Sequence, residues 1–466
     1  MRSEALEDLE VFLDAYEHHP GRYLYRTRAA LDSIELKLAE SIRQKDSISY
    51  DEFYLSLLQT LIFLKDAHTD LSRGPRYSAN PNSTSLLPFR YKIIGDEVYI
   101  TDTLAEATGD LLFSKILAID SIPVETLLDY FFKYTTADND NELYKRRFNE
   151  RIFGRNYNFF FEQKAEYLIT VCTLSGDTIE KNIQGIENYK LKADPLTPPL
   201  LTSFDLENDL AILTVNTFNY RRIVEANFDF HEFIDTFFAK VRKYKIGNLV
   251  VDLRDNYGGS SVLAMSLYAY LAADDFAWID HSFTDLDGSE DFTMFTQHPN
   301  GDYPFFNSHD TIRVGSRLKL TNGPDSKETI SATEIPFGPK QKRKNITKNK
   351  YYGDLYVLTS GITFSAGSIF AAKCIDRENT ILIGEPTGSA AGIFCAGGFL
   401  SVSLPNSEFR FNLPVMERHV AISSPDIDPY QPLNPNYLTS ATLSDLIDGI
   451  DTELKVVYEL LQKERN

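Results

Sequence analysis

The sequence contains few cysteines, and their spacing excludes several kinds of chemistry. The 466 residues include three, at positions 172, 374 and 395, and no CxxC pair. An odd number without paired spacing indicates neither a disulfide framework nor a zinc or redox motif. We expect Cys374 and Cys395, which lie in apolar stretches, to be core thiols.

The chain also lacks a long apolar run and an excess of positive charge. No stretch of about 18 apolar residues is present, so no transmembrane segment is expected. The 47 basic and 67 acidic side chains give a net charge of -20. Because an acidic surface repels phosphate backbones, nucleic acid is not an expected partner. The first residues, "MRSEALEDLEVF", lack the apolar h-region of a secretory signal. A cytoplasmic protein and an exported protein without its leader are both compatible with this start.

Three regions differ in their patterning. Residues 1–76 repeat apolar positions at helical spacing, and residues 77–195 alternate in the manner of strands, with one helix. In residues 196–466, continuous apolar strands are interleaved with helices, which predicts an α/β layer with a largely parallel sheet. The proline-rich stretch at 193–203 is the expected linker, and a polar insertion at about 284–350 is a candidate lid.

The stretch "TSGITFSAGSIFAAK" at 359–373 holds five hydroxyls at the junction of a buried strand and a helix. The helix is expected to begin near Ser365, where the N–H of Ala366 and the helix dipole point toward the serine hydroxyl. This arrangement suits a nucleophile for acyl transfer. Ser365 and Thr363 are equally good helix N-caps, and the GxSxG pattern of α/β hydrolases is absent, so a structural role stays open.

A second strand-to-helix junction, "NLVVDLRDNYGGSSV", contains adjacent glycines at 258 and 259. Without a Cβ, their N–H groups can approach a ligand closely, beside the positive end of the following helix. The pair is therefore a candidate oxyanion hole. A tight turn is the structural alternative, and a phosphate cradle is disfavoured because neither nucleotide-binding glycine motif is present.

A serine nucleophile needs a base, and the chain has eight histidines. His68 is the best placed, because it follows a strongly apolar helix and lies between Asp66 and Thr69 in "KDAHTDL". His419, in "MERHV", is the rival. A structural role is the alternative for each histidine.

Several stretches together resemble peptidase family S41, which includes the tail-specific proteases and the tricorn core protease. They occur in the expected order along nearly the whole chain: "LKDAHTDL" at 64–71, "VVDLRDNYGG" at 250–259, "LTSGITFSAGSIFAA" at 358–372, "ILIGEPTG" at 381–388 and "SSPDID" at 423–428. The strand, turn and helix pattern at 114–131 resembles the PDZ-like module of that family more loosely. The resemblance implies a ClpP/crotonase-like core at 196–466, a PDZ-like α+β segment at 77–195 and an N-terminal helical domain at 1–76.

The resemblance also implies roles for individual residues. Ser365 would be the nucleophile, with an oxyanion hole formed by the N–H groups of Ala366 and of Gly258 or Gly259. Tail-specific proteases place a lysine base where this chain has Ala390, so the resemblance is to the tricorn-like or retinoid-binding-protein-like branch, which uses a histidine, with His68 as base. That branch orients its base with a late glutamate, and Glu417 is the candidate. A glutamate exposed on a strand is the structural alternative.

The expected function is that of a serine peptidase acting on peptides or unfolded proteins, with no metal or organic cofactor. The PDZ-like segment would bind an extended peptide as an added strand. By resemblance the protein would be exported, and its oligomeric state is open. A non-catalytic peptide- or ligand-binding protein on the same fold is the alternative. An acyl-CoA enzyme of the crotonase type is disfavoured, because the helical N-terminal region and "DAHT" would have no role.

Overall fold

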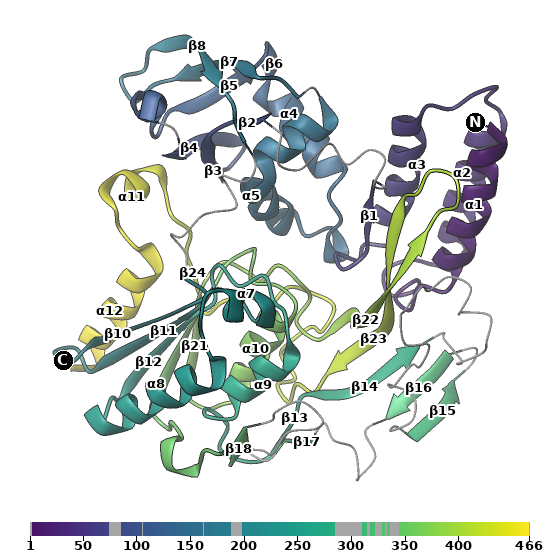
Figure 1. Cartoon of the computed structure of the whole chain (residues 1–466). Helices are drawn as coiled ribbons and strands as arrows, with labels where there is room; N and C mark the ends of the chain where they lie inside the picture. Colours follow the sequence, from purple (N-terminus) through teal and green to yellow (C-terminus); the bar gives the residue numbers. More distant parts are fainter. Residues whose placement is uncertain are drawn as a thin grey trace.

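The central layer is a six-stranded sheet with the order β10-β11-β12-β20-β21-β24 in the computed structural model (Figure 1). The strands are β10 (Leu200–Asp205), β11 (Leu210–Val215), β12 (Asn248–Asp252), β20 (Asp354–Thr359), β21 (Thr380–Gly384) and β24 (Tyr437–Leu438). From β11 to β24 each strand pairs in parallel with the next, and β10 is antiparallel to β11. The predicted α/β layer with a largely parallel sheet is confirmed.

The structure describes most of the chain. The exceptions are residues 1, 74–84, 105, 162, 188–197, 285–309, 315–316, 322–328, 331–332, 336–343 and 466. The predicted domain boundaries after residues 76 and 195 fall outside the described residues, as do part of the expected linker and most of the candidate lid. The boundaries and the lid stay predictions, whereas residues 200–203 of the expected linker belong to β10.

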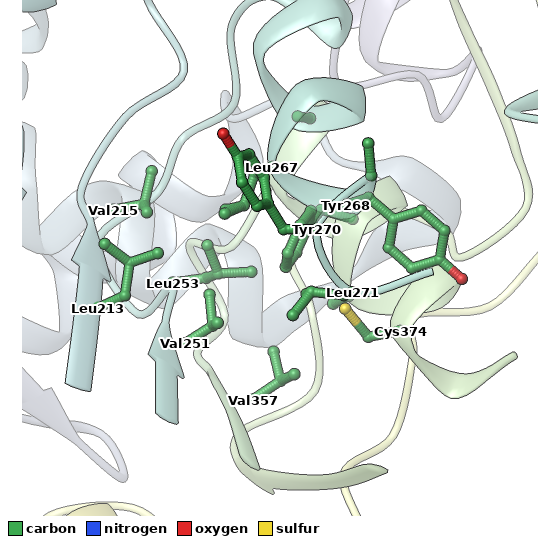
Figure 2. Close-up of a cluster of buried hydrophobic side chains, with 14 of the residues drawn as sticks. Leu213, Val215, Val251, Leu253, Leu267, Tyr268, Tyr270, Leu271, Val357 and Cys374 are labelled. Carbon is green, nitrogen blue, oxygen red and sulfur yellow. The ribbon is translucent and has the colours of Figure 1, made fainter. Parts of the chain in front are cut away.

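Helices cover both faces of the central sheet. On one face lie α8 (Phe230–Tyr244), α9 (Ser261–Tyr268) and α10 (Ala366–Ile375), and on the other lies α12 (Thr452–Arg465). Figure 2 shows Val251 and Val357 of the sheet beside Leu267 and the predicted core thiol Cys374. Neighbouring strand residues point to opposite faces. Consequently the next apolar positions pack with α12, and both faces are buried.

The N-terminal helices are α1 (Arg2–Glu17), α2 (Arg28–Arg43) and α3 (Tyr50–Ile62). They share one core with the long hairpin of β22 (Ile393–Ser403) and β23 (Arg410–Val420) (Figure 1). In this core the rings of Phe12 and Phe411 pack in a tilted arrangement with their centroids 5.6 Å apart. Directly after α3, β1 (Asp70–Ser72) pairs with β23. The segment that carries His68 is therefore held between the helices and a hairpin from the C-terminal third of the chain.

A separate antiparallel sheet lies between the N-terminal helices and the central sheet in sequence. Its strands are β3 (Phe89–Ile94), β4 (Glu97–Thr103), β5 (Lys115–Ile119), β6 (Ile122–Pro123), β7 (Glu166–Cys172) and β8 (Thr178–Gln184). They share a core with α4 (Val124–Lys133) and α5 (Glu142–Phe160). The predicted strand, turn and helix at 114–131 are confirmed, whereas the expectation of one helix in this region is wrong, because α5 is a second one. The PDZ-like identity of this segment stays a prediction.

The hairpin of β22 and β23 continues into a further sheet with β14 (Ile279–Thr284), β16 (Arg317–Thr321) and β15 (Asp310–Val314). The shorter elements are α7 (Tyr220–Glu225), α11 (Leu443–Asp448), β2 (Ser85–Leu86), β9 (Ile186–Glu187), β13 (Phe276–Ala277), β17 (Thr329–Ile330), β18 (Glu334–Ile335) and β19 (Lys344–Asn345). Within the described residues, no helix has the length and apolar character needed to cross a membrane.

Candidate active site

Ser365 lies in the turn that joins β20 to α10, and its backbone is strained. Its φ and ψ are 52° and -121°, a region that costs a non-glycine residue about 1–3 kcal/mol. The N–H of Ser365 donates to Ser389 Oγ at 3.0 Å, and this hydrogen bond connects the turn to the loop after β21. Although Ser365 occupies the N-cap position of α10, its side chain makes no capping hydrogen bond. The capping explanation for Ser365 is therefore wrong.

The five hydroxyls of the stretch from 359 to 373 differ in their partners. Four donate to backbone carbonyls: Thr359 to Glu385, Ser360 to Arg254, Thr363 to Leu253 and Ser368 to Thr363. Among the described residues, none forms a hydrogen bond with the hydroxyl of Ser365. Four hydroxyls thus stabilise the strand-to-helix junction, and that of Ser365 takes no part in these hydrogen bonds.

The glycine turn before α9 packs directly against Ser365. Gly258 has φ 89°, and a Cβ there would lie 2.8 Å from Ser365 Cβ and 3.2 Å from the N atom of Ala366. The N–H of Gly258 donates to Asn256 Oδ1 at 2.8 Å. In the described part of the chain, the N–H groups of Gly259 and Ala366 have no acceptor. Of the predicted oxyanion donors, the N–H groups of Gly259 and Ala366 are therefore available to a ligand, whereas the N–H of Gly258 is already hydrogen-bonded to Asn256.

His68 lies in the turn after α3 and faces the serine loop through an aromatic contact. Its ring stacks on Phe364, the neighbour of Ser365, with the centroids 4.6 Å apart, and on Phe394 at 5.7 Å. The side chain is 7% exposed. Neither ring nitrogen has a hydrogen-bond partner among the described residues. The structure thus brings His68 to the serine loop without a hydrogen bond to Ser365.

Asp66 lies beside His68, with Oδ1 3.8 Å from His68 Nδ1, and accepts the backbone N–H of His68 at 3.2 Å. Oδ2 of Asp66 accepts hydrogen bonds from the Thr69 hydroxyl and, at 3.1 Å, from His19 Nε2. Since His19 Nδ1 accepts the N–H of Gly21, its proton is on Nε2. Burial would raise the pKa of Asp66, but the hydrogen bond from His19 and the positive charges of His19 and His68 outweigh burial and lower it.

Asp138 approaches His68 from the segment before α5. Its carboxylate accepts the N–H of Ala67 at 2.7 Å and that of Ala390 at 3.3 Å. Burial raises the pKa of Asp138; the charge of His68 lowers it, and that of Asp66 raises it further. Burial alone would lower the pKa of His68, but the two carboxylates outweigh it and raise that pKa. Ala390, at the position where a lysine would be expected, thus contributes a backbone donor.

Glu417 lies on β23 and is buried, so the alternative of an exposed glutamate is wrong. Its carboxylate is 2.8 Å from Nε2 of His419, whose ring stacks on His281 at 4.1 Å. The structure therefore pairs Glu417 with the rival histidine, whereas the acids grouped with His68 are Asp66 and Asp138.

A second buried charge cluster anchors the loop that contains Ser389. Arg147 of α5 donates from Nε to Glu385 Oε2 at 2.8 Å and also pairs with Glu150. Glu385 accepts the N–H of Gly361 at 3.1 Å. Burial would raise the pKa of Glu385, but its hydrogen bonds to Arg147 outweigh burial and lower it to about 2. Each charge in this cluster has an opposite partner.

Three parts of the site escaped prediction from the sequence. Asp138 is 70 residues from His68 and belongs to no motif. Asp66, by contrast, lies two positions before His68 and could have been singled out. Asn256 lies two residues before Gly258 in the sequence "DNYGG". Its side chain could therefore have been expected to accept a hydrogen bond from a glycine N–H. The aromatic wall of Tyr144 and Tyr257 around Phe364 depends on the arrival of α5 and carries no sequence signal.

Comparison with known proteins agrees with the resemblance seen in the sequence. Residues 209–394 match the model of peptidase family S41. The structure of mature CPAF complexed with lactacystin aligns with a TM-score of 0.66 and 13% identity, over 99% of this chain and 97% of that one. A crystal structure of mature CPAF also aligns with a TM-score of 0.66, at 14% identity over 100% and 99%. At these identities the structures establish a shared fold. No match was found among curated proteins.

Proposed function

We propose that this chain, in which residues 209–394 match peptidase family S41, is a serine peptidase with Ser365 as its nucleophile. The observation that carries the proposal is the state of Ser365. It combines a strained backbone, a hydroxyl without a hydrogen bond to any described residue and a position at the start of α10. Strain persists where the surroundings impose it, and it clusters at active sites.

In the proposed reaction, Ser365 Oγ attacks the carbonyl carbon of the scissile peptide bond and its proton passes to Nε2 of His68. The tetrahedral oxyanion receives hydrogen bonds from the N–H groups of Ala366 and Gly259. His68 then protonates the leaving amine, and water attacks the acyl-enzyme with His68 again as base. The catalytic hydrogen bond between Ser365 and His68 would have to form with substrate, since such bonds are often long in free enzymes.

We assign the orienting acid to Asp66. Its position 3.8 Å from His68 Nδ1 supports this role, and its lowered pKa keeps it ionised. A carboxylate there favours the tautomer with the proton on Nδ1, which leaves Nε2 free to accept the proton of Ser365. Glu417, the acid proposed from the resemblance, is the competing candidate.

A non-catalytic peptide- or ligand-binding protein is the second candidate function. The observation that favours it is the absence, among the described residues, of a hydrogen-bond partner for either His68 nitrogen. A binding protein needs no proton transfer, so its histidine would have no reason to engage Ser365.

Hydrolysis of a peptide library by three proteins separates the two functions. We expect the wild type to cleave, Ser365→Ala to show no cleavage above background, and the matched control Ser360→Ala to cleave. Ser360 is in the same turn, but its hydroxyl is bound to the carbonyl of Arg254. Cleavage that survives in Ser365→Ala would contradict the assignment, and a wild type that binds peptides without cleaving them would support the binding protein.

A further inference from the structure

We propose that Asp66, His68 and Asp138 form a binding site for a divalent transition-metal ion such as Zn²⁺, which inhibits the enzyme by occupying its base. One potential ligand atom of each residue lies within 4.8 Å of those of the other two. The site itself is independent of the proposed function, whereas its inhibitory effect depends on that function.

The donor set and its spacing suit such an ion. Imidazole nitrogen and carboxylate oxygen bind Zn²⁺ at about 2.0–2.2 Å, so ligand atoms in a tetrahedral site are about 3.3 Å apart. The separation of His68 Nδ1 from Asp66 Oδ1 is 3.8 Å. A small contraction of the cluster would therefore complete three ligands of a tetrahedral site and leave the fourth position open.

His68 is the observation that points to a ligand. Its side chain is more than nine-tenths buried, and neither ring nitrogen has a hydrogen-bond partner among the described residues. Unpartnered polar atoms are costly in such surroundings, as are two carboxylates of like charge next to each other. A cation that accepts a lone pair from the ring and lies between the carboxylates relieves both costs.

The surroundings of the two carboxylates resemble the supporting shell of a metal site. Asp66 is held by His19 and Thr69, and Asp138 by the backbone N–H groups of Ala67 and Ala390. Such outer hydrogen bonds fix the direction of the ligands without using all of their lone pairs. The carboxylates are therefore oriented by the fold before a cation arrives.

A neighbouring group, His19, Asp66 and Cys395, also has ligand atoms within 4.8 Å of one another, but it is a poorer site. Nδ1 of His19 accepts the N–H of Gly21, and Nε2 lies 2.7 Å from the hydroxyl of Thr69 and 3.1 Å from Asp66. Both nitrogens are already used. A metal there would have to break hydrogen bonds, whereas His68 loses none.

Binding of the ion at Nδ1 explains the inhibition. A neutral imidazole that coordinates through Nδ1 carries its proton on Nε2. Nε2 is then a donor and cannot accept the proton of Ser365. The ion and the Nδ1 proton compete for the same place beside Asp66, so a chelator should restore activity.

Isothermal titration of zinc chloride into chelator-treated Ser365→Ala protein tests the site directly, because this variant cannot digest itself. We expect one equivalent to bind, with affinity reduced at least about tenfold when Asp138→Asn or His68→Gln is added, by analogy with the loss of supporting residues at metal sites. Cys395→Ser and His419→Ala are matched controls that should retain binding. Circular dichroism establishes that each variant is folded, and if Asp138→Asn fails to fold, His68→Gln carries the test.

Absence of binding, binding that survives both ligand substitutions, or loss of binding in Cys395→Ser would overturn the site, whatever the protein's activity. In wild type we expect Zn²⁺ to stop peptide hydrolysis and excess chelator to restore it. If Zn²⁺ binds to an active enzyme without slowing hydrolysis, the inhibitory role is wrong. If no peptide is cleaved under any condition, the proposed function fails, and the titration still decides whether the site exists.

Discussion

The two buried charge clusters near the serine loop differ in how completely their charges are paired. Around Arg147, an arginine lies between Glu150 and Glu385, and the Gly361 N–H completes the set. Around His68, two carboxylates converge on a histidine whose ring nitrogens have no hydrogen-bond partner among the described residues. A paired cluster holds its parts in one arrangement, whereas an incompletely paired one can take up a proton or an ion. We infer that the first is structural and the second functional.

The largest expected effect is that of His68→Ala on activity. Removal of the base should lower kcat/KM for peptide hydrolysis by about 10⁴- to 10⁶-fold. Because the ring also packs against Phe364 and Phe394, the midpoint of thermal unfolding should fall, and circular dichroism at the assay temperature establishes that the variant is folded. His419→Ala, the rival histidine, serves as the control. A loss of activity confined to His419→Ala would reverse the assignment of the base.

Asp66→Asn and Glu417→Gln separate the two candidates for the orienting acid. We expect Asp66→Asn to reduce kcat by up to about 10⁴-fold, because an amide beside Nδ1 favours the wrong tautomer of His68. Glu417→Gln should have a much smaller effect, because Glu417 is bonded to His419. Steady-state kinetics of both variants provides the measurement, and a greater loss in Glu417→Gln would transfer the role to Glu417.

Glu385→Gln should instead reduce stability. Loss of one partner from a buried ion pair typically lowers the free energy of unfolding by about 3–5 kcal/mol. We expect a decrease at the lower end of this range, because Glu150 still pairs with Arg147. Since the pKa of Glu385 is lowered to about 2 in the folded protein, its stabilising contribution is present above the unfolded pKa near 4.3. That contribution is lost as the pH falls toward 2.

Urea unfolding of wild type and Glu385→Gln across this pH range checks the prediction. The difference in the free energy of unfolding between the two proteins should be largest near neutral pH and should shrink as the pH falls from about 4 to about 2. A difference that does not change with pH would show that the ion pair is not its source.

The smallest expected effect concerns the pH dependence of hydrolysis. A base must be neutral, so activity falls as the pH drops through the pKa of His68. That pKa is raised because Asp66 and Asp138 outweigh burial. Asp138→Asn should therefore move the acidic limb of kcat/KM to lower pH in chelator-containing buffer, whereas Glu385→Gln should leave it in place. If the acidic limb of kcat/KM stays in place in Asp138→Asn, the charge of Asp138 does not raise the pKa of His68, and the two clusters do not differ in their effect on the base.

Local patterns predicted the parts of the site that depend on a single junction. The strand ending at Thr359 and the helix beginning at Ala366 located Ser365, and the paired glycines located a donor at Gly259. Asp138, the distant acid beside His68, could not be assigned in this way. Asp138 reaches the ring only because α5 docks on the loop after β21, where Asn141 donates to the carbonyls of Thr387 and Gly388. Contacts between segments far apart in sequence leave no periodic signal in either segment.

The same limit applies to the fold. Alternating strands and helices predicted the parallel sheet, because each element buries its own face in a recognisable period. The hairpin of β22 and β23 was not foreseen as the partner of the N-terminal helices, since its apolar residues suit any neighbouring apolar surface. Because of this packing, the segment with His68 lies near the segment with Ser365.

Labelling with a fluorophosphonate, followed by peptide mapping, tests the central claim most directly, because the reagent forms a stable bond only with an activated serine hydroxyl. We predict a single adduct at Ser365 in the wild type, absent in Ser365→Ala, strongly reduced in His68→Ala and retained in Ser360→Ala. A folded wild type that remains unlabelled at Ser365, or an adduct on another residue of the same stretch, would contradict the account.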